Sequence, residues 1–107
     1  MSTYNYAQAL QHADQEIVDI MQAPFLAALP QYIQDIESAT ASLDHDALRR
    51  HAHTLKGLAG NFCAEPVVQL SLQLELLGKQ QQTASAAALI SELRTELSAL
   101  EQALSTV

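Results

Sequence analysis

Residues 44–62 read DHDALRRHAHTLKGLAGNF, and the order of apolar and polar residues in this stretch is that of one amphipathic helix. Asp44 suits the N-cap because its carboxylate can accept hydrogen bonds from the free amide groups of the first turn. The apolar residues recur at steps of three and four, which places them on one face of a helix. They are Leu48, Ala52, Leu55, Ala59 and Phe62. We therefore expect a helix over about residues 44–62 that buries this face in a core.

His53 lies outside this apolar face, so we expect its ring to face solvent. Arg49, Lys56, Gly57 and Gly60 lie one or two turns away on the same side. The surface around the histidine is therefore predicted to be basic and free of bulky side chains. Glycine in a helix interior costs about 1 kcal/mol relative to alanine, so two glycines on one exposed face indicate a docking requirement.

The same apolar spacing predicts two helices after this stretch. A shorter helix covers about residues 67–77, with Pro66 in its first turn and Gly78 just beyond its last turn. A long helix covers about residues 86–104, and Thr83 or Ser85 is expected to cap its start.

Residues 14–41 predict a further helix before this stretch, although Pro24 and Pro30 interrupt it. A proline inside a helix costs roughly 3 kcal/mol, so we expect the helix to restart or kink around them. A short leading helix is expected to begin near Asn5. Four amphipathic helices with short links form an antiparallel bundle. The predicted fold is therefore all-α, an antiparallel up-and-down four-helix bundle with a short extra N-terminal helix, in one domain over residues 1–107.

Composition excludes several classes of protein. Hydrophobic residues make up 49% of the chain, which favours a folded domain over a disordered one. The net charge of −7 opposes binding to nucleic acid, and no apolar run is long enough to insert into a membrane. Of only five Lys and Arg residues, three lie within four residues of His53, namely Arg49, Arg50 and Lys56. The single cysteine, Cys63, cannot form an internal disulfide, which favours a reducing cytoplasm.

The stretch AHTLKGLAGNFCA, from Ala52 to Ala64, resembles the phosphorylation-site helix of the histidine-containing phosphotransfer (HPt) family. Val67, Leu70, Leu74 and Glu75 are similar in spacing to the next helix of that family, so the resemblance covers essentially the whole chain. One departure is Cys63, which stands where many members have glycine at the turn between the two helices.

The resemblance implies that His53 carries a phosphoryl group between the aspartates of receiver domains, which belong to response regulators or hybrid sensor kinases. A neutral imidazole can attack phosphorus near neutral pH, and Lys56, one turn away, can neutralise charge on the phosphoryl oxygens. We expect no cofactor and no metal in the chain itself, because the receiver supplies the acidic residues and the magnesium. The expected state is a monomer in the cytoplasm, either free-standing or as a domain of a membrane-anchored hybrid kinase.

Other polar residues near His53 have less definite roles. Arg49 and Arg50 are expected to contact the phosphate or the partner. Gln69 or Gln73 on the next helix is a candidate to hydrogen-bond the histidine or its phosphate, and both are expected on the partner-binding surface. His51 lies about 200° around the helix from His53 and is expected to pack at the edge of the core. The two histidines cannot share a metal, because ligands on one helical face are three or four residues apart.

Two other functions remain open at the level of sequence. The chain could be an adaptor bundle that binds a partner through an amphipathic face and never carries phosphate. It could also be the phosphorylation domain of a chemotaxis-type histidine kinase, which resembles this fold and bears an exposed histidine. Both alternatives keep the helical bundle and differ in what reaches His53.

Overall fold

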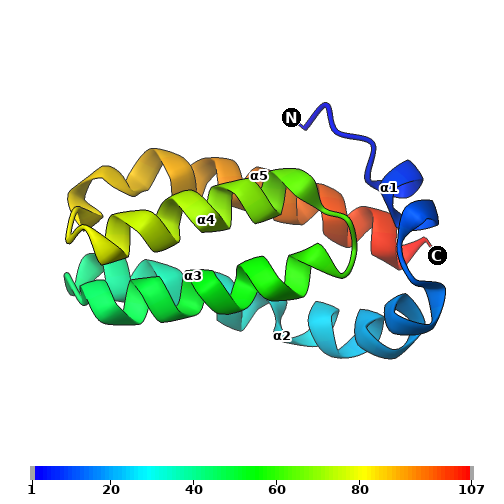
Figure 1. Ribbon diagram of the computed structural model, residues 1–107, viewed down its shortest axis with the longest axis horizontal. Coiled ribbons are helices and arrows are strands. Elements are labelled where there is room, and N and C mark those ends of the chain that lie inside the picture. The colour runs from blue at the N-terminus through cyan, green and yellow to red at the C-terminus, as the bar shows by residue number, and fades with distance from the viewer. Residues whose placement is uncertain (1, 107) are drawn as a thin grey trace.

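The computed structural model describes residues 2–106, which contain α-helices, one short 3₁₀ helix and no strand. The elements in chain order are α1 (Tyr6–His12), α2 (Gln15–Ala41), α3 (His45–Gly60), α4 (Glu65–Lys79), η1 (Thr83–Ser85) and α5 (Ala87–Ser105). Helices α2 to α5 lie side by side along the long axis of the molecule and alternate in direction, and α1 crosses one end of them (Figure 1). The predicted fold, an antiparallel four-helix bundle with a short N-terminal helix, is confirmed.

The four long helices pack as a ring in which α3 lies between α2 and α4, and α5 lies between α4 and α2. The apolar faces predicted from the sequence point inward. On α5, for example, Leu93, Leu97, Leu100 and Leu104 are all at most 2% exposed. Burial of one such side chain stabilises the fold by about 1.5–3 kcal/mol, so the apolar stripes account for the bundle. None of the helices within residues 2–106 has the length and apolar character needed to cross a bilayer.

Helix α2 is one helix that includes Pro24 and Pro30, so of the two predicted outcomes, a restart or a kink, the restart does not occur. Both prolines are exposed, which puts their rings on the solvent side of the helix. Phe25 and Leu29 follow on the inner side and are buried. Burial of these two side chains gives about 1.5–3 kcal/mol each, which is similar to the roughly 3 kcal/mol that each proline costs. Packing in the bundle therefore holds the helix together.

Three helix ends are formed by residues in the left-handed region, and none of these residues is glycine. Leu43, Cys63 and Gln81 have φ values of 55°, 54° and 58°. At each end a backbone hydrogen bond closes the last turn, as from the amide of Gln81 to the carbonyl of Gly78 at 3.2 Å. The glycine that many HPt members have at the position of Cys63 is explained by this backbone conformation, which glycine adopts without strain.

Gly78 lies inside α4, so the prediction that it follows the end of this helix is wrong. A Cβ atom built on Gly78 would lie 2.8 Å from the backbone nitrogen of Arg49 and 2.8 Å from the carbonyl oxygen of His45. Glycine is therefore required here because α3 and α4 approach each other closely. Gly57 and Gly60 differ, because a Cβ at either position would meet no atom within 4 Å.

The start of α5 also differs from the prediction. Thr83 and Ser85 form a 3₁₀ turn, and α5 begins at Ala87 without a side-chain cap. Thr83 is buried, and its hydroxyl has no hydrogen-bond partner in the described part of the chain. The central helix is also slightly shorter than the predicted range of 44–62, because Phe62 lies beyond the end of α3 and fills the core from the turn.

The N-terminal segment is fixed to the end of the bundle by two tyrosines. Asn5 caps α1 by accepting a hydrogen bond from the amide of Gln8, as the sequence predicts. The Tyr6 hydroxyl donates to Glu96 on α5 at 2.6 Å, and burial together with this bond raises the pKa of Tyr6. The Tyr4 hydroxyl donates to the carbonyl oxygen of Cys63 at 2.7 Å. The segment thus joins α5 to the turn between α3 and α4.

Replacement of Gly78 by alanine tests the close approach of α3 and α4. The added methyl group would force the two backbones apart, so we expect the free energy of unfolding to fall by about 1–3 kcal/mol, the usual cost of overpacking. Gly57→Ala is the matched control, because it adds the same group to a helix interior with open space around it. It should raise the free energy of unfolding by about 0.5–1 kcal/mol. Urea denaturation of the two variants beside the wild type measures both effects, and equal stabilities would contradict the packing argument.

Candidate functional site

His53 projects from the outer face of α3, with its side chain 65% exposed. Its position follows from the packing of the helix, since the neighbouring Ala52 and Leu55 are fully or almost fully buried. Gly57 and Gly60, one and two turns further along, are exposed and leave the surface beside the ring open. A partner can therefore approach the imidazole without displacing any part of the bundle.

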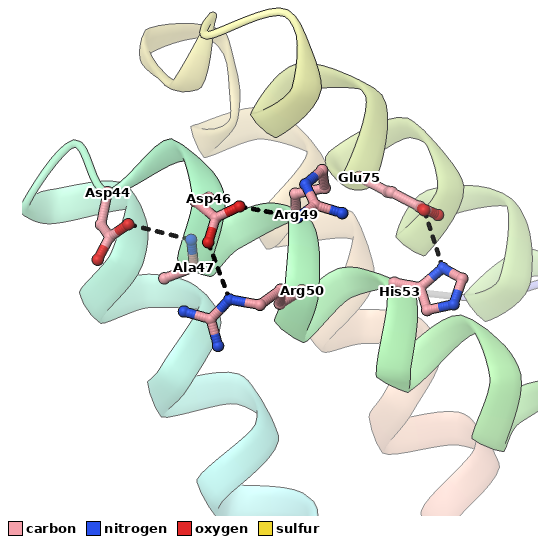
Figure 2. Close-up of polar contacts among 7 residues, drawn as sticks. All are labelled: Asp44, Asp46, Ala47, Arg49, Arg50, His53 and Glu75. Atoms are coloured by element: carbon pink, nitrogen blue, oxygen red, sulfur yellow. Dashed lines mark hydrogen bonds and ion pairs between the residues drawn. The ribbon is translucent and has the colours of Figure 1, made fainter.

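The ring of His53 is held from one side by a carboxylate on α4. Nδ1 of His53 lies 2.9 Å from Oε2 of Glu75, and Figure 2 shows the other ring nitrogen turned away from this carboxylate. An ionised carboxylate can only accept hydrogen bonds, so the hydrogen of a neutral imidazole must reside on Nδ1. Nε2 then carries the free electron pair. The geometry thus leaves Nε2 as the ring nitrogen that is free to react.

Lys56 binds the other oxygen of the same carboxylate, with 2.6 Å between its Nζ and Oε1 of Glu75. The side chains of Lys56 and Glu75 are 27% and 18% exposed, so the lysine is less free than an isolated surface cation. Partial burial of Glu75 raises its pKa, but the hydrogen bonds from Lys56 and His53 more than offset this and hold that pKa below its usual range. Glu75 is therefore the ionised centre that connects histidine and lysine.

The packing of α4 against α3 brings Glu75 to this place. Leu74 is fully buried, and Glu75 follows it at the edge of the buried face. Ser71 and Gly78, four residues before and three residues after Glu75, are small and buried. Small residues on the same side of the helix allow the two backbones to come close, so the carboxylate reaches the adjacent helix.

Arg49 and Arg50 do not reach His53 in this structure. Nη2 of Arg49 and Nε of Arg50 donate to the two oxygens of Asp46, at 2.8 Å and 3.1 Å (Figure 2). These bonds hold the pKa of Asp46 below its usual range, and the bond from Arg49 has the larger effect. Each cation of the predicted basic surface therefore has a carboxylate partner, and the surface is less basic than the sequence indicates.

No hydrogen bond joins Gln69 or Gln73 to His53 among the described residues, and their expected contact with a phosphoryl group on His53 stays a prediction. The amide of Gln69 donates to Glu65 at 2.7 Å, and the residue from α4 that reaches the histidine is Glu75. The sequence did carry a signal for Glu75. It lies between Ser71 and Gly78 on the side of α4 that small residues mark as a close contact.

His51 is half-buried at the edge of the core, as expected from its position on the helix. Among residues 2–106, no group of three or more histidine, cysteine or acidic side chains is arranged to hold a metal ion. The site therefore consists of the exposed imidazole of His53, the partly buried side chains of Glu75 and Lys56 beside it, and the open surface at Gly57 and Gly60.

His53 is thus an exposed histidine on a helical bundle, with the carboxylate of Glu75 and the ammonium group of Lys56 beside it. The family model of the Hpt domain matches residues 20–103, and the chain therefore belongs to the Hpt family. Members of this family are phosphocarrier modules with a histidine phosphotransfer role in phosphorelays, where they interact with receiver domains. Comparison with curated proteins and with solved structures gave no match.

The tautomer of His53 can be measured directly by ¹⁵N NMR of the imidazole nitrogens. At a pH where the ring is neutral, we expect Nδ1 of His53 to carry the hydrogen, because Glu75 accepts from it. Glu75→Ala should remove this preference, whereas Glu65→Ala on the same helix should leave it unchanged. A wild-type ring protonated mainly on Nε2 would show that Glu75 does not select the tautomer.

Proposed function

We propose that His53 is the phosphoacceptor of this Hpt domain and exchanges a phosphoryl group with receiver aspartates through its Nε2 atom. The observation that supports the proposal most strongly is the hydrogen bond between Nδ1 of His53 and Glu75 beneath an open ring. It leaves the free electron pair on the nitrogen that faces solvent. Within this proposal the chain acts as one monomeric domain in the cytoplasm and depends on its partner for magnesium.

The transfer step follows from this geometry. The electron pair of Nε2 attacks the phosphorus atom of an aspartyl phosphate, the N–P bond forms, and the P–O bond to the aspartate breaks as the carboxylate leaves. The imidazole ring gains positive charge in this step, and the carboxylate of Glu75 stabilises that charge through the bond to Nδ1–H. The reverse reaction breaks the N–P bond and returns the phosphoryl group to an aspartate, so one residue serves both directions.

Lys56 shares the carboxylate of Glu75 with His53. It lies one helical turn further along α3 and is oriented by Glu75 at 2.6 Å. Phosphoryl transfer is controlled mainly by positioning and by stabilisation of charge on the equatorial oxygens. In this proposal Lys56 shares its three hydrogens between Glu75 and the phosphoryl oxygens.

The outer face of α3 is the surface on which a receiver would dock. Gly57 and Gly60 need no glycine for internal packing, because a Cβ at either position would meet open space. The open space beside these two glycines is therefore available to a partner that must approach His53 closely. Arg49 and Arg50 lie on the other side of His53 along the helix and are 43% and 59% exposed.

Labelling with two phosphate donors tests the proposed acceptor. Incubation with phosphoramidate, a small donor for histidine, and with a radiolabelled phosphoreceiver should each give an acid-labile label in the wild type. His53→Ala should abolish both labels, because the attacking nitrogen is lost, and His51→Ala should retain them.

Equal labelling of the His53→Ala variant and the wild type, or absence of label from both, would refute the carrier function and leave the adaptor alternative. Labelling by a histidine-kinase core with ATP and by none of the receivers from the source organism would instead favour the phosphorylation domain of a chemotaxis-type kinase.

Lys56→Met should slow transfer from a phosphoreceiver by about 10-fold or more, because it removes the cation beside the phosphoryl oxygens and keeps the aliphatic stem. Its effect on the free energy of unfolding should stay within about 1 kcal/mol, the usual range for a partly exposed ion pair. Lys79→Met makes the same change in charge in the last turn of α4 and serves as the control. Equal transfer rates for the two variants would exclude the proposed role of Lys56.

A further inference from the structure

Asp46 binds two arginines close to the site, and the proposed transfer step gives it no role. It lies in the first turn of α3, its side chain is 65% exposed, and its two oxygens bind Arg49 and Arg50 separately. Figure 2 shows these bonds on the side of the arginines away from His53. Both guanidinium groups of the expected docking surface are thus engaged by one carboxylate.

The carboxylate of Asp46 is not the cap of α3. Asp44 is the N-cap of the helix, and its side chain already accepts the hydrogen bond from the amide of Ala47 at 3.0 Å. The ion pairs of Asp46 connect exposed side chains three and four residues apart, and pairs of this kind contribute little to stability. A role on the surface accounts for them better than a role in the core.

We propose that Asp46 is a positioning residue that competes with the receiver for Arg49 and Arg50. This inference rests on the proposed function, in which a receiver with an acidic pocket docks over His53. While Asp46 holds both arginines, an acidic partner must displace one carboxylate to gain each guanidinium. Docking is then weaker than it would be with both guanidinium groups free.

The count of charges supports this role. Arg49, Arg50 and Lys56 give three positive charges, and Asp46 and Glu75 give two negative charges, so these five side chains together carry +1. Attraction between a charged surface and an oppositely charged partner mainly accelerates their association. A carrier that receives phosphate from one protein and gives it to another must also leave each of them, so a moderated attraction suits the task.

Asp46→Asn tests the inference with a receiver that exchanges phosphate with the wild-type chain. At low salt the variant should show a kcat/KM for transfer that is about two- to fivefold higher, because both arginines become available to the receiver. The increase should disappear near about 0.5 M salt, where charges on the surface are screened. The rate of labelling by phosphoramidate should not change, since that donor does not dock on α3.

Two comparisons separate competition from a general effect of charge. Glu92→Gln makes the same change in net charge on the exposed side of α5, which is not adjacent to α3 in the ring, and should leave kcat/KM unchanged. In a background of Arg49→Gln and Arg50→Gln, Asp46→Asn should also have no effect, because no arginine remains to be released.

Three results would overturn the inference. One is a rate for Asp46→Asn equal to that of Glu92→Gln, and another is a lower rate, which would mean that Asp46 prepares the arginines for the partner instead of competing for them. Either result with His53 still labelled overturns this inference alone. A chain that phosphoramidate and receivers do not label at His53 overturns the proposed function and this inference together.

Discussion

The close packing of α3 against α4 is the constraint on which the site depends. At Gly78 the two backbones leave no room for a methyl group, because its carbon atom would lie 2.8 Å from backbone atoms of Arg49 and His45. Glu75 lies three residues before this contact and reaches His53 at 2.9 Å. The close approach at Gly78 therefore brings Glu75 near enough to α3 to orient the imidazole of His53.

The helices could be predicted from the sequence because each has an apolar face at helical spacing, and the exposure of His53 followed from its place outside such a face. The helix ends were harder to predict because Leu43, Cys63 and Gln81 occupy positions where glycine is the usual signal. The bond to Glu75 connects residues 22 apart in the chain and depends on the register between two helices. Periodicity within one helix contains no information about that register.

The sequence shows how many cations lie near His53 but does not show which carboxylates they bind. The cations near His53 suggested a basic surface, but the structure pairs them with Asp46 and Glu75, so positive and negative groups alternate along it. These ion pairs orient the charged side chains and also reduce the net positive charge around His53. In the proposed docking on α3, a partner would therefore meet paired charges instead of free cations.

The tyrosine bonds at the end of the bundle bear on where this domain begins. The family match starts at residue 20, inside α2, whereas Tyr4 binds the carbonyl of Cys63 in the turn that leads from the histidine helix to the helix of Glu75. A fragment cut at the family boundary would lack this brace and would expose the core surface beneath Leu10. The smallest piece that keeps the native environment of that turn is therefore longer than the region that the family model matches.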